Sequence, residues 1–595
     1  MKIKAIILGV LTDWVATVIL AIPICIIGVV IHLTHGGSID TFDTFFNGYK
    51  PLMLASIIAG SLGTIIGGVV TALVAKEKRI WNAFLMGIAT SLMGIPFCLS
   101  QPLWFIVTSF VLMVPCAMLG GWLIERRKRG QPSPPPLPQV KTGKRENVVI
   151  ALAMIPFLIY FIVIIYVKIL SRDIPPPNTV DLVPERVELT AEQNGFTYFV
   201  SATNLLYWPT NTSVVTDYLD GKTVDEAVIQ DTISHNPEMM ALLEKGLGCQ
   251  RCLTPEVVSF DADISYLSPW RSMGRVLAIK VKHDRLAKRY VEATRTCISL
   301  LRYGDMIQRD AQCEINYLVG LAVLDIGFTQ AQDLARDADI PPDELTRLSE
   351  ALAHLGPFDN GLIRAIKSEY RTVANMIDQV RDGKAGIGEF FLGIGQKPIS
   401  DFTHGRFKSG YMFQPNNTKL VFADVYRVII TNSSLPYASM TFPDAEKVLS
   451  MNGGFVRLMI RPNAMGKIMF KLLIPAQDSM CERKSRADGS LAATRLLVAC
   501  NAYIKKEGTL PEDLQSLVPV YLPTVPTDPY DGKPFRYSKA KGIVYSVGHD
   551  LKDSGGSPFI SDDCKAKNPS KWKWDAEDVV FNIQAPTNKV SGTGL

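Results

Sequence analysis

Four aspartates near the C-terminal end of this 595-residue chain are the residues whose type and spacing most suggest chemistry. They are Asp550, Asp553, Asp562 and Asp563. Carboxylates crowded into one short segment repel one another, whereas a hard cation such as Ca²⁺ is bound by several carboxylate and carbonyl oxygens on a flexible loop. The segment therefore predicts a calcium site. The alternative is a solvated acidic turn that needs no cation.

Cysteines form the second chemical pattern. The spacing Cys249-Gln-Arg-Cys252 fits a redox pair, half of a zinc site or a structural disulfide. No second cysteine pair or nearby histidine completes a zinc site, so a disulfide, or membership of two separate disulfides, is the favoured prediction. Cys297 and Cys313 flank a predicted helical hairpin and are candidates to join each other. The histidines of the chain are widely scattered, so we assign no catalytic or cofactor-binding residue.

The aspartates need a scaffold, and the preceding residues predict one. Apolar side chains over 491–507 have helical spacing, and Gly508 follows as a C-terminal cap, since glycine tolerates positive φ. The pair Asp531-Gly532 predicts a tight turn, with strands at 535–537 and 542–547. One helix packed on a small antiparallel sheet is the expected fold of this segment.

A longer pattern runs through the same region. It contains Pro511-Glu512-Asp513-Leu514, Tyr521-Leu522-Pro523, the run Asp528-Pro-Tyr-Asp-Gly-Lys-Pro-Phe-Arg-Tyr537, and Ser546-Val-Gly-His-Asp550 before Gly555-Gly556. These residues resemble the C-terminal domain of the major pseudopilins of type II secretion, over about 492–564. The resemblance implies calcium in the final loop, with Asp550 and Asp562 at the matching positions. The chain departs from the family by one extra residue before the glycine pair, which contributes Asp553.

Residues 191–484 predict a mainly α-helical domain. Apolar residues recur at three- to five-residue steps within 276–307, and 316–334 and 343–355 are further amphipathic segments. The region 485–595 then forms the pseudopilin-like module and tail.

The first part of the chain is membrane-like. A bilayer core needs about 20 apolar residues per helix, and five runs qualify, at 13–33, 52–75, 80–99, 103–124 and 148–170. We therefore predict a four-helix transmembrane region over 1–129, a Pro-rich basic linker over 130–147, a fifth transmembrane helix over 148–170 and a Pro-rich spacer over 171–190. Small residues at four-residue spacing around Gly63 and Gly67 predict close helix packing. Asp13, next to Trp14, is expected at the membrane interface.

Charge gives the orientation. Residues 1–146 contain 13 Lys and Arg against 6 Asp and Glu, whereas the remainder has 49 against 51. Basic residues lie in alternate loops, which are those that stay in the cytoplasm. The N-terminus is thus predicted inside a bacterial plasma membrane and residues 171–595 outside it, in an oxidising compartment where disulfides persist.

The fold class predicted for the whole chain is a multi-pass α-helical membrane bundle, an extracytoplasmic mainly helical domain and a small C-terminal α+β module. The chain looks like a bacterial membrane-anchored exported protein. Its expected partners are the lipid bilayer and envelope proteins, and nucleic acid is excluded because no basic surface is predicted. We expect a non-catalytic binding or structural role, with a link to secretion or pseudopilus-like assembly implied by the resemblance. The alternatives are an envelope hydrolase or thiol oxidoreductase, and a small membrane transporter built from the first four helices.

Overall fold

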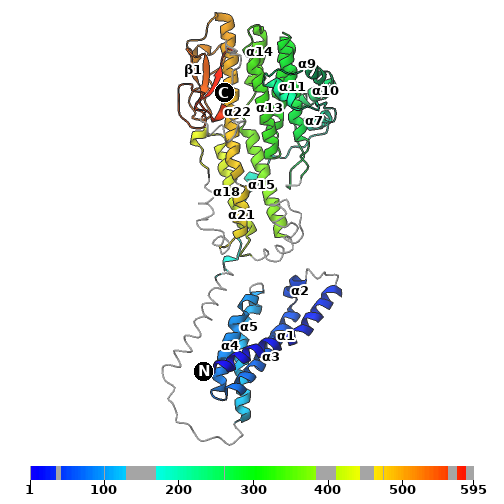
Figure 1. Ribbon diagram of the computed structural model, residues 1–595, viewed down its shortest axis with the longest axis vertical. Coiled ribbons are helices and arrows are strands. Elements are labelled where there is room, and N and C mark those ends of the chain that lie inside the picture. The colour runs from blue at the N-terminus through cyan, green and yellow to red at the C-terminus, as the bar shows by residue number, and fades with distance from the viewer. Residues whose placement is uncertain are drawn as a thin grey trace. The chain divides into compact units, whose positions relative to one another are not determined.

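The computed structural model of the chain describes residues 2–34, 42–98, 101–128, 166, 169–259, 262–382, 410–442, 461–473, 475–560 and 573–584. The chain divides into two compact units, Met1–Leu170 and Ser171–Leu595. Figure 1 labels the elements of both units.

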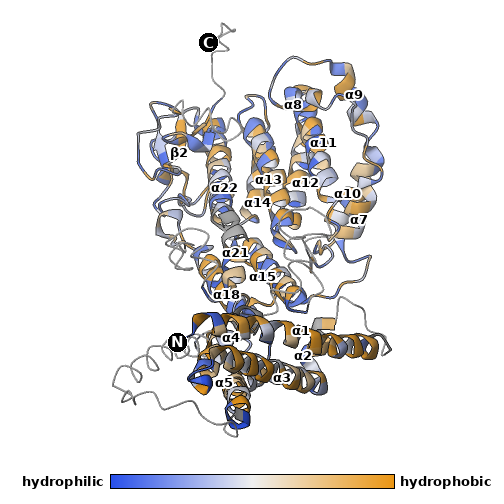
Figure 2. Ribbon diagram, turned by 60° about the horizontal axis from the view of Figure 1, so that its bottom comes forward, coloured by the Kyte–Doolittle hydropathy of each residue, from blue (hydrophilic) through white to orange (hydrophobic). Residues whose placement is uncertain are grey.

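The first unit is made of helices. They are α1 (Ile3–Thr34), α2 (Phe42–Gly48), α3 (Lys50–Ala75), α4 (Arg79–Cys98) and α5 (Leu103–Lys128). Within the described residues, three segments are long and apolar enough to cross a membrane: Ile3–His32, Lys50–Ala75 and Trp104–Arg127. Figure 2 shows the hydrophobic character of these helices. The predicted linker at 130–147, and nearly all of the predicted span at 148–170, lie outside the described residues.

Small residues bring α3 close to its neighbours, as their spacing predicts. A Cβ atom added to Gly63 would lie 2.1 Å from Thr17 Oγ1 of α1, and one added to Gly68 would lie 2.2 Å from the carbonyl oxygen of Ala117 in α5. Glycine is therefore required at both contacts, and α3 packs between α1 and α5.

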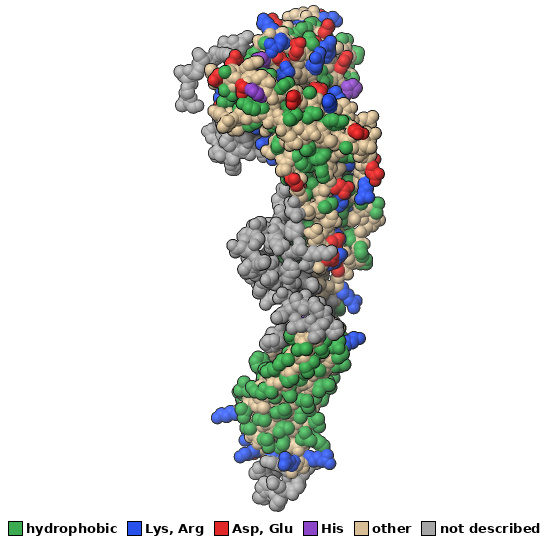
Figure 3. Space-filling view, turned by 90° about the vertical axis from the view of Figure 1, so that its right-hand side faces the viewer, with side chains coloured by type: hydrophobic (Ala, Val, Ile, Leu, Met, Phe, Trp, Pro, Cys, Tyr) green, Lys and Arg blue, Asp and Glu red, His purple; other side chains and the backbone are tan. Residues whose placement is uncertain are grey.

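Three basic segments lie at one end of this unit. The backbone N–H of Lys2 donates to Asn82 Oδ1 at 3.0 Å, which joins the start of α1 to the start of α4. Gly121, near the end of α5, lies beside the backbone of Arg79. Figure 3 shows Lys and Arg side chains gathered around this end of an otherwise hydrophobic surface.

The prediction that Asp13 lies at the membrane interface was wrong. Its side chain is directed into the bundle, and the residue is 1% exposed. The neighbouring Trp14 is 46% exposed, so α1 turns Asp13 toward its neighbouring helices and Trp14 away from them.

The second unit is mostly helical, as predicted. Its helices are η2 (Val180–Leu182), α7 (Gly195–Thr203), α8 (Ser213–Leu219), α9 (Glu226–Ser234), α10 (Pro237–Leu247), α11 (Leu267–Leu286), α12 (Tyr290–Arg309), α13 (Glu314–Ala335), α14 (Pro342–Ala353), α15 (Asp359–Arg381), α18 (Pro415–Asn432), η3 (Tyr437–Ser439), α21 (Ala464–Leu473), α22 (Pro475–Glu507) and η4 (Leu514–Leu517). The periodic stretch 276–307 is two helices, because the chain reverses at Lys288, whose φ is +60°.

The described residues also form a small antiparallel sheet in the order β1-β2-β3. Its strands are β1 (Arg536–Ser538), β2 (Ile543–Ser546) and β3 (Val579–Asn582). Tyr537 pairs with Val544, and Val544 pairs with Phe581. The first two strands were predicted, as was the helix end, since α22 stops at Glu507 and Gly508 has φ +75°. The third strand was not predicted.

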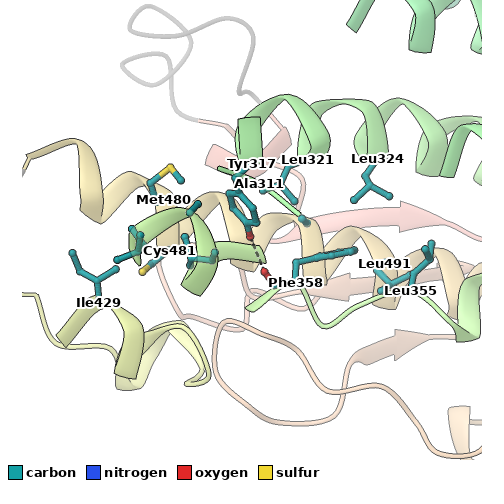
Figure 4. Packing of buried hydrophobic residues seen from close by; sticks show 14 of the residues in the cluster. Ala311, Tyr317, Leu321, Leu324, Leu355, Phe358, Ile429, Met480, Cys481 and Leu491 are labelled. Atoms are coloured by element: carbon teal, nitrogen blue, oxygen red, sulfur yellow. Dashed lines mark hydrogen bonds between the residues drawn. The ribbon is translucent and has the colours of Figure 1, made fainter. Parts of the chain in front are cut away.

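Helix α22 belongs to two hydrophobic cores. Leu491 and Val498 are buried in the core formed with α13 and α15, whereas Leu496, Leu497 and Cys500 are buried against the sheet. Figure 4 shows the first of these cores, in which Tyr317 Oη donates to the carbonyl of Phe358 at 3.0 Å. The predicted boundary between 484 and 485 therefore falls inside one helix, and the sheet module is continuous with the helical part.

The predicted spacer at 171–190 packs on the second unit along part of its length. The carboxylate of Asp173 accepts hydrogen bonds from the backbone N–H groups of Asn416 and Asn417, at 2.7 and 2.9 Å, at the start of α18. Leu182 is 1% exposed within the core. The Pro-rich segment is thus part of the folded unit.

Candidate functional site

The sheet module is organised around a buried carboxylate, Asp528. Its Oδ1 atom accepts from the Tyr530 N–H at 3.0 Å and from Ser546 Oγ at 2.8 Å. Its Oδ2 atom accepts from the Val547 N–H at 3.0 Å and from Arg536 Nη1 at 2.9 Å. The residue is fully buried. Every acceptor position of this carboxylate is occupied by the module itself, so Asp528 holds the turn and β2 together.

A second buried carboxylate closes the loop in which the predicted calcium ligands lie. Asp578 Oδ2 accepts from the backbone N–H groups of Ser554, Gly556 and Ser557, at 3.1, 2.8 and 3.0 Å. Asp578 is fully buried at the start of β3. Sequence reasoning missed this residue, although an acidic residue directly before the apolar run 579–581 was a signal.

Two of the four predicted calcium ligands are described. Asp550 Oδ1 accepts from the Lys552 N–H at 3.0 Å. Asp553 accepts from the Gly555 N–H at 3.0 Å and from Tyr545 Oη at 3.2 Å. The backbone hydrogen bond from Gly555, with smaller contributions from Tyr545 and Arg536, lowers the pKa of Asp553, which keeps this carboxylate charged. Asp562 and Asp563 lie outside the described residues.

No group of three metal-ligating side chains occurs within the part of the chain that the structure describes. Asp550 and Asp553 supply charged oxygens of the kind that calcium prefers. A calcium site would need further oxygen ligands besides these two carboxylates. The calcium site stays a prediction.

A polar cluster that the sequence did not reveal lies where the module meets the helical part. His549 Nδ1 is 3.6 Å from Glu482 Oε1 of α22, and Glu482 also pairs with Arg486. The ring of Tyr437 packs 5.4 Å from the His549 ring and 5.6 Å from that of Tyr530. An imidazole beside a carboxylate can exchange a proton. The residues come from segments far apart in the chain, so no local motif marks them.

Another carboxylate pair lies on α13 and α15. Burial and the nearby charge of Glu314 raise the pKa of Glu369. This environment favours the protonated form of the carboxyl group. Ser368, the preceding residue on α15, donates to Gln312 Oε1 at 3.5 Å in the turn between α12 and α13.

The Cys249 and Cys252 thiols are free in the structure. Cys252 is fully buried, and its backbone N–H donates to Asp310 Oδ2 at 2.9 Å. Burial raises the pKa of both thiols, and for Cys252 the nearby Asp310 adds to the effect. A redox pair needs a stabilised thiolate. The surroundings of these cysteines do the opposite and disfavour thiol oxidoreductase chemistry.

The predicted bridge between Cys297 and Cys313 is also not formed. Cys297 lies in the middle of α12, where its thiol contacts the Gly327 carbonyl at 3.8 Å. Cys313 is the residue before α13, and its sulfur accepts from the Asn316 N–H at 3.4 Å. The 12 residues of α12 between Cys297 and Arg309 rise about 18 Å, so a bridge would require α12 to unwind. The predicted helical hairpin is present as α12 and α13. The two thiols do not meet, because Cys297 lies in the middle of α12 and Cys313 lies at the turn.

The described residues define a protein with a first unit of apolar helices, of which three in that part of the chain are long and apolar enough to cross a membrane, and a second, mostly helical unit with a small sheet. Comparison of the chain with protein-family models, with curated proteins and with solved structures finds no match. The likeness to pseudopilins therefore rests on the residues of the sheet module alone.

Proposed function

We propose that the chain is a multi-pass protein of a bacterial plasma membrane whose second unit stands outside the cytoplasm and has a non-catalytic binding or structural role. The single observation that carries the binding role is the sharing of α22 between the helical core and the sheet core. The sheet module is thereby held in a fixed position and can present its surface to a partner.

The membrane placement is supported by charge and by helix length. The start of α1, the turn between α3 and α4 and the end of α5 are basic and lie at the same end of the first unit. Basic ends of this kind stay in the cytoplasm. The apolar run at 148–170 is then the crossing that carries residues 171–595 to the far side.

Reporter fusions test the orientation. Alkaline phosphatase joined after Leu595 is expected to be active, because it folds only outside the cytoplasm, and the same enzyme joined after Arg129 is expected to be inactive. Fluorescent protein fusions at the two positions should show the reverse pattern. Phosphatase activity after Arg129, with a fluorescent fusion after Leu595, would contradict the proposed topology.

Site-specific crosslinking in intact cells tests the binding role. Val520 and Phe559, on the sheet module, are 73% and 61% exposed and are therefore accessible to a partner. A photoreactive residue at either position is expected to give discrete adducts with an envelope protein. Leu286, 56% exposed at the end of α11, is the matched control and should give none. Adduct patterns that are equal at all three positions would remove the proposal.

A calcium-bound final loop belongs to the same proposal, with Asp550, Asp553, Asp562 and Asp563 as ligands. Thermal unfolding of the full-length protein should then shift by several degrees between calcium and a chelator. Asp553→Asn is expected to remove that shift. A thermal unfolding curve that is the same with calcium and with the chelator would contradict the calcium site and would leave the proposed membrane topology untouched.

A further inference from the structure

The feature of the first unit that the proposed function does not use is Asp13. Its distance along the helices from the basic residues at their ends places it near the centre of the bundle, and three helices give the same result. It lies nine residues beyond Lys4 on α1, and it contacts Thr64, which is 12 residues before Lys76 at the end of α3. At 1.5 Å per residue these distances are about 14 and 18 Å, close to half of a hydrocarbon core about 30 Å thick. Thr90, the third neighbour, is 11 residues beyond Arg79, or about 17 Å.

Hydroxyl groups from three helices face the carboxylate. Thr17 Oγ1 and Thr64 Oγ1 both lie 3.2 Å from Asp13 Oδ1. Thr90 of α4 is close enough to interact with the same carboxyl group, yet neither Thr90 Oγ1 nor Asp13 Oδ2 has a well-aligned hydrogen-bond partner within the described residues. The basic groups of these helices, among them Lys4, are at the helix ends.

Close packing excludes bulk water from this place. A Cβ atom added to Gly67 of α3 would lie 2.8 Å from the Cβ atom of Asp13, so the backbone of α3 directly covers the carboxylate. Asp13 and Thr64 are each 1% exposed. An unpaired carboxylate in such a place is strongly unfavourable, and ionisable residues inside membrane bundles commonly mark proton or ion sites.

We propose that Asp13, with the hydroxyls of Thr17, Thr64 and Thr90, forms an intramembrane site that reversibly binds a small hard cation, either a proton or Na⁺. A proton on Oδ2 would donate to Thr90 Oγ1 and satisfy both unpaired atoms at once. Na⁺ would do the same by binding the two oxygens together with the hydroxyls that already face Oδ1. The inference rests on the membrane placement of the first unit and not on its orientation.

A hydrophobic carbodiimide tests the site in full-length protein reconstituted into lipid nanodiscs, because this reagent modifies protonated carboxyl groups in apolar surroundings. Labelling of Asp13 is read by peptide mass spectrometry over a pH series, with NaCl or with choline chloride. Labelling that increases with acidity and ignores Na⁺ identifies a proton site. If NaCl suppresses the labelling and choline chloride does not, the site binds Na⁺.

Three variants separate binding from a packing role. Asp13→Asn should abolish the label, and Thr90→Val should weaken proton or Na⁺ binding roughly tenfold, the equivalent of about one hydrogen bond. Thr12→Val is the matched control, since Thr12 lies on α1 beside Asp13 and its hydroxyl donates to the Leu8 carbonyl of its own helix at 2.8 Å. Infrared spectra record whether a protonated carboxyl band appears in the wild type and is lost in Asp13→Asn.

Two outcomes overturn the proposal. One is labelling that does not change with pH or with NaCl, because Asp13 would then be permanently protonated and would serve only in helix packing. The other is the absence of both the label and the infrared band, which would describe a permanently charged one. Both can be read even if the chain proves to have the opposite orientation, because the purified protein is open to solvent on both faces of the nanodisc.

Discussion

At the scale of single residues, the same side chain does different things in this protein according to burial. Asp528 is fully buried and accepts four hydrogen bonds, one of them from Arg536. Asp550 is exposed and accepts one local bond from the Lys552 N–H. Removing the charge should therefore have unequal effects at the two positions.

Asp528→Asn is expected to lower the free energy of unfolding of the second unit by about 3 kcal/mol, because an amide N–H group would replace an acceptor that faces buried donors, and Arg536 would keep Asp531 but lose Asp528. The measurement is urea-induced unfolding of the full-length protein followed by tryptophan fluorescence. Asp550→Asn is the control and, with a chelator present so that bound calcium makes no contribution, should change stability by less than about 0.5 kcal/mol. Equal effects of the two substitutions would show that Asp528 is not an organising residue.

Asp284, at the end of α11, makes the second unit sensitive to acid. Burial of its carboxylate would raise its pKa, but hydrogen bonds from Lys280 and Arg289 outweigh burial and lower the pKa overall. A folded-state pKa below the unfolded value means that the charged group stabilises the fold at neutral pH. That stabilisation is lost as the pH falls below about 4.

The substitution Asp284→Asn should therefore destabilise the protein at neutral pH and have a smaller effect near pH 3, measured as urea midpoints at the two pH values. Asp220→Asn, at an exposed position, is the control and should shift neither midpoint. A deficit in Asp284→Asn that is independent of pH would show that the loss comes from packing and not from the charge.

At the scale of elements, helix contacts in the first unit depend on which face of α3 a glycine occupies. Gly63 is covered by Thr17 of α1, whereas a Cβ atom added to Gly60 would meet nothing within 4 Å. The two glycines lie three residues apart on one helix, so they have the same helix propensity and differ only in their surroundings. This makes them a matched pair.

We expect Gly63→Ala to destabilise the bundle by about 1–3 kcal/mol through overcrowding, and Gly60→Ala to leave it unchanged or slightly more stable. The readout is the temperature at which detergent-solubilised protein loses its gel-filtration peak. If Gly60→Ala were the more damaging change, the packing of α1 on α3 would have to be revised.

At the scale of the whole molecule, α22 decides how the second unit is divided. Its residues Leu491 and Val498 belong to the helical core, and Leu497 and Cys500 belong to the sheet core. Buried polar contacts also cross between the two parts, such as Gln332 Nε2 to Thr494 Oγ1 at 2.9 Å. A break at residue 484 would expose apolar surface on both sides.

The fragment 485–595 is therefore expected to lack a cooperative melting transition, whereas 171–595 should unfold in one. Circular dichroism melting of the two purified fragments checks this. A fragment 474–595, which keeps the whole of α22, is the control for truncation of the helix and should also fail, because the face toward α13 stays uncovered. Cooperative melting of 485–595 would restore the sheet module as an independent domain.

Local patterns predicted much of the fold, because helix period, glycine caps and turn residues act over a few neighbours. The helices at 314–335 and 342–353, the end of α22 at Gly508 and the first two strands were all readable in this way. Strand β3, which is as long as β2, was missed because it follows a segment without clear turn residues. Its pairing with β2 depends on a contact more than thirty residues away.

The candidate sites were predicted less well, for the same reason. Neither the cluster of Glu482 and His549 nor the loop closure by Asp578 has a local motif. The cysteine spacing suggested bridges that the structure does not form, since spacing along a chain does not fix which end of a helix a thiol occupies.

The apolar helices, their basic ends and the mostly helical character of the remainder follow from the amino-acid sequence, because hydrophobic period and charge are properties of neighbouring residues. The direction of Asp13 into the bundle and away from the interface, and the joining of two cores by α22, were seen first in the folded chain. Both outcomes depend on which helix packs on which face. That choice is made by side chains far apart in the chain meeting at one surface, and no local pattern records it.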